Sequence, residues 1–162
     1  MLYVILTLSY TKTTPDQKEA PKPDDMLCFE LHAASRAMTA VYRPLLEDLG
    51  LTYPQYLVML LLWEREPLRV HELGRELELD SGTLSPLLKR LENSGLIRRQ
   101  RRTDDEREVE ATLTQEGRSL ADRASEIPKE IGRATKLAAE DYDELVLKLK
   151  ELRASLRQAL SE

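Results

Sequence analysis

The 162-residue chain lacks features that several protein classes require. Its single cysteine, Cys28, cannot form an intramolecular disulfide, which fits a reducing cytoplasm. No apolar run approaches the ~20 residues that cross a bilayer as a helix, so we expect no membrane protein. The apolar residues 1–10 have neither a basic start nor a small-residue cleavage site, so we expect no secretory signal. Aromatic residues make up 5% of the chain, which leaves the core to leucine-rich helices.

Motifs of common enzymes and cofactor sites are also missing. The sequence has no glycine-rich phosphate loop, no nucleophile elbow and no HExxH motif. Cys28 and His32 stand one helical turn apart, a spacing that could bind a metal, but no second cysteine or histidine cluster completes such a site. We therefore expect a protein that is not an enzyme and that needs neither a cofactor nor a metal.

Charge is distributed unevenly along the chain. The net charge of −5 argues against non-specific coating of nucleic acid. Residues 89–107 nevertheless contain seven basic and four acidic side chains. A basic segment on an acidic body can form a focused anion-binding surface, and the alternative is a solvated, charged hairpin without a ligand.

The hydrophobic pattern predicts a mainly helical fold. Residues 1–24 contain three prolines and read as a flexible extension, whereas residues 25–162 form one domain. Asp24 or Asp25 can cap a first helix, which Pro44 bends or ends. A second, buried helix runs from Tyr53 to Trp63. The last helix carries a near-heptad stripe that needs a cover, either from within the chain or, as we favour, from a second copy: Leu145, Leu149, Leu152, Leu156 and Leu160.

The middle of the chain predicts a helix-turn-helix followed by a β-hairpin wing. Two short amphipathic helices at 70–77 and 81–93 flank a three-residue turn. Residues 96–102 and 107–114 read as two strands, the second with alternation at Val109, Ala111 and Leu113. The second helix either begins at Asp80 or Ser81 and loses a hydrogen bond at Pro86, or is capped by Ser85. We thus expect residues 50–114 to form the DNA-binding region and residues 25–49 and 116–162 to form dimerisation helices.

Such a helix and wing can present side chains to phosphates and base edges. Arg107 at the hairpin tip could reach a minor groove, with Asp105 holding its guanidinium in place. The predicted DNA-binding set is Ser81, Thr83, Ser85, Lys89, Arg90, Arg99, Arg101, Asp105 and Arg107.

Six segments together resemble the MarR family of winged-helix repressors, and within it the OhrR type that senses organic hydroperoxides. They are LCFEL at 27–31, ASRAMT at 34–39, YRPLL at 42–46, LTYPQYL at 51–57, LDSGTLSPLLKRLE at 79–92 and DDER at 104–107. The resemblance implies that Cys28 is the peroxide-reactive thiolate. It also implies that Tyr42 and Tyr53, from the partner subunit, donate hydrogen bonds to its sulfur.

With no second cysteine, the chain resembles the one-cysteine subtype of these sensors. The resemblance implies a cytoplasmic homodimer that binds double-stranded operator DNA while Cys28 is reduced and releases it after oxidation by an organic hydroperoxide. A small cellular thiol or overoxidation completes release. Two alternatives stay open: a MarR-type repressor released by a small aromatic ligand, with Cys28 structural, and a thiol peroxidase.

Overall fold

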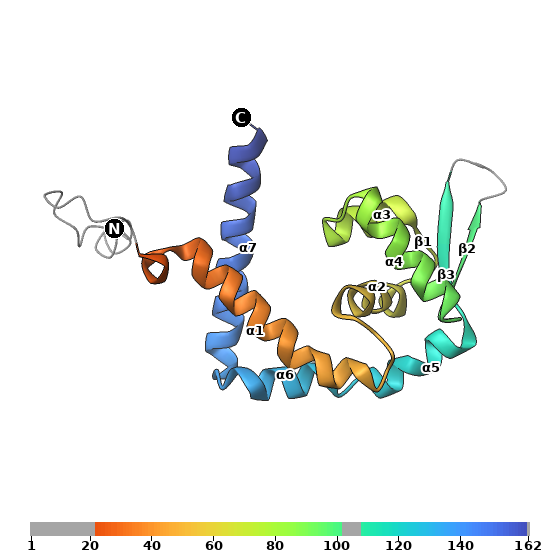
Figure 1. Ribbon diagram of the computed structural model, residues 1–162, viewed down its shortest axis with the longest axis horizontal. Coiled ribbons are helices and arrows are strands. Elements are labelled where there is room, and N and C mark those ends of the chain that lie inside the picture. The colour runs from red at the N-terminus through yellow and green to blue at the C-terminus, as the bar shows by residue number, and fades with distance from the viewer. Residues whose placement is uncertain (1–21, 102–107, 162) are drawn as a thin grey trace, which may run out of the picture. The chain divides into compact units, whose positions relative to one another are not determined.

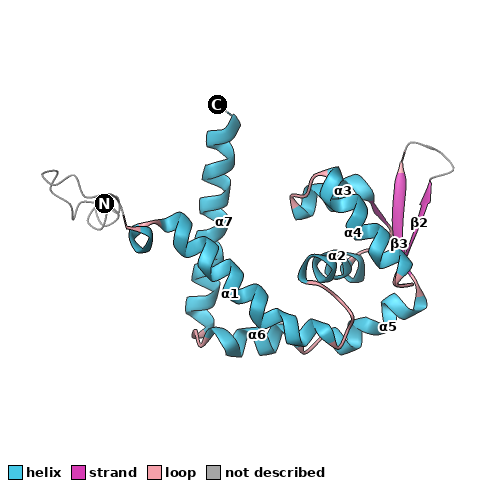
Figure 2. Cartoon of the chain, viewed as in Figure 1, coloured by secondary structure: helices cyan, strands magenta, loops and turns pink. Residues whose placement is uncertain are grey.

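The computed structural model describes residues 22–101 and 108–161, which form a mainly helical chain with one small sheet (Figures 1 and 2). The chain divides into two compact units, residues 1–37 and 38–162, each described by itself below. The elements are η1 (Pro23–Asp25), α1 (Leu27–Glu47), α2 (Tyr53–Glu64), β1 (Leu68–Arg69), α3 (Val70–Leu77), α4 (Ser81–Asn93), β2 (Ile97–Arg101), β3 (Val109–Leu113), α5 (Gln115–Ala124), α6 (Ile127–Thr135) and α7 (Ala139–Ser161).

The first unit contains η1 and the N-terminal part of α1. The carbonyl of Met26 accepts hydrogen bonds from the backbone N–H groups of Phe29 and Glu30, and α1 begins at Leu27. Neither Asp24 nor Asp25 stands directly before this helix, so the predicted aspartate cap is wrong: both belong to the 3₁₀ turn η1. Of the predicted flexible extension, residues 1–21 lie outside the described residues.

In the second unit, α1 continues through Pro44 and ends only at Glu47. Of the two expectations for Pro44, a bend or an end of the helix, the end is therefore wrong. A proline inside a helix removes one N–H donor, and here the helix tolerates the loss. The chain then turns at Gly50, whose φ of +66° favours glycine. The N–H of Leu51 donates to the carbonyl of Leu46, and both leucines are buried, as is typical of a glycine-terminated helix.

Helix α2 lies at the centre of the core, where it contacts α3, α4, α5 and β3 (Figure 1). Its start is capped by Gln55, whose Oε1 accepts a 2.8 Å hydrogen bond from the N–H of Thr52. Val58, Met59 and Leu62 are at most 1% exposed, which confirms the prediction that this helix is buried.

The predicted helix-turn-helix is confirmed as α3 and α4, with the expected bounds. Asp80 caps α4 by accepting a 2.8 Å hydrogen bond from the N–H of Thr83. The open question about Pro86 is thereby settled: α4 begins at Ser81, and Pro86 lies inside it.

The wing is confirmed as the antiparallel pair β2 and β3, in a register that runs from Ile97 opposite Leu113 to Arg101 opposite Val109. A third strand, β1, was not predicted from the sequence: its two residues pair with the other side of β3, giving the strand order β1-β3-β2. Two residues are too short to show a strand's alternation.

Helices α5 and α6 cover the core with Leu120, Ala124, Ile127 and Ile131, all of them buried. Helix α7 has no buried residue, and much of its predicted stripe is exposed: Leu145, Leu149, Leu156 and Leu160. None of the helices in the described part of the chain combines the length and the apolar content that a bilayer-spanning segment needs.

The junction between α5 and the wing depends on a close backbone approach at Gly117. A Cβ atom at this position would lie 2.0 Å from the carbonyl oxygen of Leu96. The carbonyl of Gly117 also accepts a 2.8 Å hydrogen bond from the indole Nε1 of Trp63 in α2. The absence of a side chain therefore lets α5 contact both the wing and α2.

We expect Gly117→Ala to lower the free energy of unfolding by about 1–3 kcal/mol, because the new methyl group forces α5 away from Leu96. Gly132→Ala is the matched control, since a Cβ there meets nothing within 4 Å. Alanine in place of this helical glycine should leave stability unchanged or raise it slightly. Urea unfolding measures both variants, and equal stability of the two would contradict the interpretation.

Candidate nucleic-acid interface and cysteine site

Helix α4 separates an apolar face from a polar one. Its leucines at 84, 87, 88 and 91 are buried. The α4 side chains that were predicted to contact DNA lie on its exposed face: Ser81, Thr83, Ser85, Lys89 and Arg90. The Thr83 hydroxyl donates a 3.0 Å hydrogen bond to Asp80, so it is oriented at the start of the helix. Hydrogen bonds from Thr83 lower the pKa of Asp80.

The arginines of β2 divide into two kinds. Arg98 and Arg101 are exposed, whereas Arg99 is held by Glu92 near the end of α4. The guanidinium of Arg99 donates to Glu92 Oε2 from Nε at 3.0 Å and from Nη2 at 2.6 Å. These bonds lower the pKa of Glu92. The predicted contacts Asp105 and Arg107 lie outside the described residues.

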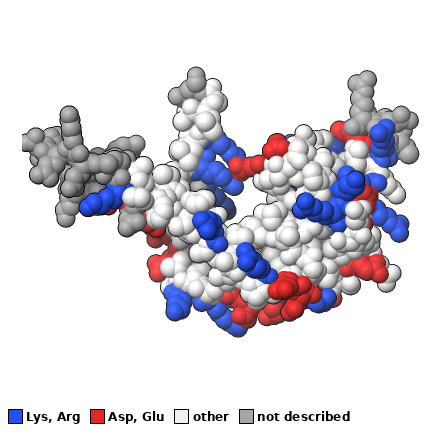
Figure 3. Space-filling model, viewed as in Figure 1, with Lys and Arg blue, Asp and Glu red and all other residues white. Residues whose placement is uncertain are grey.

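Further basic side chains lie near this region and were missed by the sequence analysis. His71 and Arg75 are exposed on α3. Arg69 of β1 is ion-paired to Glu108, just before β3, with 3.1 Å between Nε and Oε2. In Figure 3, lysine and arginine side chains gather at the right of the view, where Figure 1 places α4 and the strands. Cationic groups on one face suit a polyanion such as DNA.

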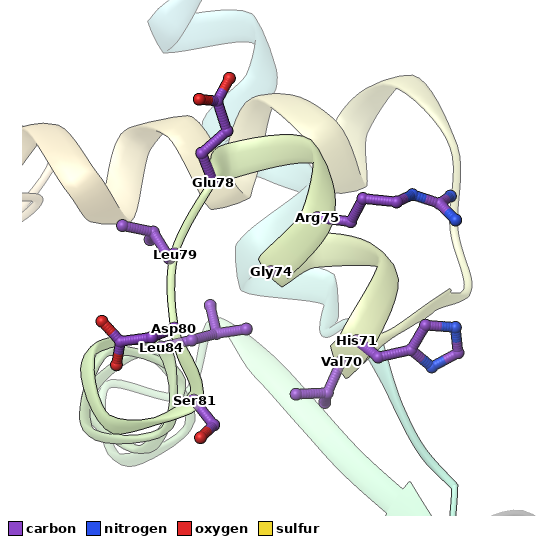
Figure 4. Close-up of a pocket in the computed structure, with 9 residues that line it drawn as sticks. All are labelled: Val70, His71, Gly74, Arg75, Glu78, Leu79, Asp80, Ser81 and Leu84. Carbon is purple, nitrogen blue, oxygen red and sulfur yellow. The ribbon is translucent and has the colours of Figure 1, made fainter. Parts of the chain in front are cut away.

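A groove of about 570 Å³ opens between α3 and the start of α4 (Figure 4). The side chains of Val70 and Leu84 point toward one another across it, whereas those of His71 and Arg75 extend to one side. Glu78 and Asp80 also line the groove. It therefore combines apolar walls with charges of both signs.

Cys28 is the second residue of α1 and is exposed in the first unit. This position lies in the first turn of the helix. His32, one turn further along, is also exposed. Within residues 22–101 and 108–161, no group of three or more His, Cys, Asp or Glu side chains could hold a metal ion.

Tyr42 and Tyr53 come together in the second unit. Their ring centroids are 4.7 Å apart, and the ring of the buried Tyr56 lies 5.9 Å from that of Tyr42. Burial, followed by the nearby hydroxyls of Tyr53, Tyr56 and Tyr142, raises the pKa of Tyr42 to about 12. The phenol therefore keeps its proton at neutral pH and remains a hydrogen-bond donor. Tyr142 of α7 was not predicted from the sequence, because no motif marks it.

Comparison with known proteins extends the likeness to most of the chain. The family described as "Transcriptional regulator SarA/Rot" matches residues 40–124. The organic hydroperoxide resistance transcriptional regulator of Bacillus subtilis (strain 168) is 49% identical over 137 residues, which cover 85% of this chain and 93% of that protein.

Two solved structures of AbfR, a protein of Staphylococcus epidermidis, have the same fold. Reduced AbfR bound to DNA matches with a TM-score of 0.73 and 38% identity, covering 83% of this chain and 92% of that one. Overoxidised AbfR bound to DNA matches with a TM-score of 0.62 and 39% identity over 78% of this chain and 92% of that one. Together with the winged helix-turn-helix described above, these likenesses show that the chain belongs to the SarA/MarR-type family of winged-helix transcriptional regulators.

Proposed function

We propose that the chain is a redox-sensing repressor that binds operator DNA as a homodimer while Cys28 is reduced and releases it when an organic hydroperoxide oxidises Cys28. The observation that carries the proposal is the position of Cys28, the only thiol, exposed in the first turn of an apolar helix. The 49% identity to an organic hydroperoxide resistance regulator supports the same chemistry.

The DNA-binding surface would be the exposed face of α4 together with the wing. A helix fits the major groove, where Ser81, Thr83 and Ser85 near its start can approach base edges. Lys89, Arg90 and Arg101 carry exposed positive charge suited to phosphates. Asp105 and Arg107 complete the proposed surface from outside the described residues.

A second copy of the chain would cover the exposed apolar faces of α1 and α7. Leu27 and Phe29 on α1 are 61% and 42% exposed, and Leu156 on α7 is 55% exposed. Exposed apolar side chains of this size on a helix face often mark an interaction surface. Their burial against a second copy would also pair two recognition helices, as a pseudo-palindromic operator requires.

The chemistry would begin with attack of the Cys28 thiolate on one oxygen of the hydroperoxide. The O–O bond breaks, the transferred OH makes the sulfur a sulfenic acid, and the departing alkoxide takes a proton from water to leave as the alcohol. A small cellular thiol then forms a mixed disulfide with Cys28, and the sulfenic hydroxyl leaves as water. The bulky group so attached disturbs packing around Cys28 and changes the separation of the two recognition helices.

Two features refine this sequence of steps. Phenol O–H groups stabilise a thiolate, so we assign Tyr42 and Tyr53 as donors to Cys28, as the resemblance implies. The overoxidised form of AbfR is bound to DNA. For this chain we therefore place release at the mixed disulfide and not at overoxidation. Because the protein would bind operator DNA, we propose that it acts in the cytoplasm. We propose a regulatory and not an enzymatic role.

A second candidate is a repressor released by a small aromatic ligand, with Cys28 structural. The groove beside α4 favours it, because the apolar side chains of Val70, Leu79 and Leu84 could contact a ring and Arg75 could attract a carboxylate. An aromatic carboxylic acid that weakens DNA binding without modifying Cys28 would distinguish this candidate from the redox sensor.

We expect Cys28→Ser protein to stay bound to DNA from upstream of its gene when an organic hydroperoxide and a small thiol are added, because serine cannot be oxidised to a disulfide. Wild-type protein should release the same labelled DNA, as measured by fluorescence anisotropy. A Cys28→Ser/Ser119→Cys variant moves the lone thiol to an exposed position on α5 and should also stay bound. Release of the Cys28→Ser protein at the wild-type rate would exclude the sensor role.

We expect Tyr42→Phe and Tyr53→Phe each to slow the oxidation of Cys28 by about tenfold or more, because each removes a donor to the thiolate. Tyr56→Phe is the matched control from the same aromatic cluster and should oxidise at the wild-type rate. Stopped-flow trapping of free thiol after addition of cumene hydroperoxide measures all three. Unchanged rates in both Tyr42→Phe and Tyr53→Phe would remove these tyrosines from the site.

The raised pKa of Tyr42 also predicts how stability depends on pH. In the unfolded chain tyrosine loses its proton near pH 10, whereas in the folded chain Tyr42 keeps it to about pH 12. Between these values the unfolded state binds fewer protons, so the free energy of unfolding falls as pH rises. Denaturant unfolding at pH 9 to 12 should show this fall, and Tyr42→Phe should make it shallower; an equal fall in both proteins would contradict the assignment.

A further inference from the structure

Arg99 differs from its exposed neighbours Arg98 and Arg101 because its guanidinium is ion-paired to Glu92 within the protein. The exposed fraction of its side chain is 27%, and that of Glu92 is 34%. A single carboxylate receives three hydrogen bonds from Arg99: its backbone N–H donates to Oε1 at 3.0 Å, and its guanidinium donates twice to Oε2. Two guanidinium donors converge on one carboxylate oxygen while the backbone donor holds the other, and this paired geometry fixes orientation as well as distance.

The two residues join the end of the recognition helix to the middle of the wing. Glu92 is the second-last residue of α4, and Arg99 is the central residue of β2, opposite the fully buried Ala111 of β3. Between them the chain reverses at Gly95, where φ is +73°. Helix α4 and strand β2 are in contact (Figure 2), and the Glu92–Arg99 pair lies across this contact.

A carboxylate close to a helix C-terminus is disfavoured by the helix dipole. Glu92 therefore needs the arginine, and the lowered pKa of Glu92 agrees with this pairing. The backbone N–H of Arg99 also depends on Glu92 as its hydrogen-bond acceptor. Loss of either side chain would loosen the same joint between α4 and β2.

We infer that Arg99 and Glu92 act as a clamp that sets the position of the wing relative to the recognition helix. Arg99 affects DNA binding by holding Glu92 and thereby the wing, and not as a phosphate ligand. The inference rests on the proposed function only in taking α4 and the wing as the DNA-binding surface. It assigns a positioning role to Arg99, whose positive charge alone had placed it among the DNA contacts. It assigns the same role to Glu92, whose negative charge would repel DNA.

The test compares binding of wild type, Glu92→Gln, Arg99→Gln and the double variant to labelled DNA from upstream of the gene and to a random-sequence duplex of equal length. If the pair is a clamp, each single variant weakens binding to the upstream DNA by about tenfold, and the double variant is no weaker than the worse single one. Glu64→Gln, which removes an exposed carboxylate at the end of α2, controls for net charge and should bind as wild type.

Salt dependence separates positioning from phosphate contact. Removal of a phosphate ligand lowers the slope of log affinity against log salt by about one. We expect Arg101→Gln to show this change and Arg99→Gln to keep the wild-type slope. Arg99→Lys keeps the charge but loses the paired geometry, so it should weaken binding to the upstream DNA nearly as much as Arg99→Gln.

Tighter binding of Glu92→Gln to both DNAs, or a slope lowered by about one in Arg99→Gln, would overturn the clamp and make Arg99 a phosphate ligand. If a glutamine variant does not fold by circular dichroism, Arg99→Lys alone decides: near wild-type affinity contradicts the clamp. Failure of the proposed function is seen separately, because wild-type protein would then bind the upstream and random DNAs equally.

Discussion

The packing of α4 against α2 determines what this protein can present to a ligand. Leucines on one face of α4 are buried, and α2 beneath them contributes side chains that are almost fully enclosed. This burial fixes the rotation of α4 about its axis, so that its serine, threonine and basic side chains face outward together. The wing follows from the same packing, because β2 begins four residues after α4 ends and is joined to it through Glu92 and Arg99.

The cysteine chemistry depends on a different set of constraints. A single thiol in the first turn of a helix does not by itself select one oxidant. The selectivity of Cys28 must come from the side chains that surround it in the dimer. The clustered tyrosines supply neutral donors that stay protonated far above physiological pH. Leu27 and Phe29 of α1 and the exposed leucines of α7 supply apolar surface that suits a second copy. A dimer would thus bring together the thiol, the tyrosines and the exposed apolar side chains.

Local patterns in the sequence were sufficient to predict most of the fold. Helical spacing predicted α3 and α4 but left the start of α4 around Pro86 open, and alternation at Val109, Ala111 and Leu113 predicted the second strand of the wing. Contacts between distant residues were not accessible in this way. Nothing local shows that Glu92 holds Arg99, that Leu96 approaches Gly117, or that Pro44 is tolerated inside α1. For the candidate site, the resemblance supplied Cys28, Tyr42 and Tyr53, whereas the proximity of Tyr142 required the folded chain.

The most direct test of the account is to measure release from DNA and the state of Cys28 in the same sample. Reduced protein bound to labelled upstream DNA would receive one equivalent of cumene hydroperoxide and a small thiol, and samples would be split between anisotropy and intact mass spectrometry. The account predicts that the released fraction equals the fraction carrying one thiol adduct on Cys28. Full modification of Cys28 with the DNA still bound, or release with Cys28 unmodified, would contradict it.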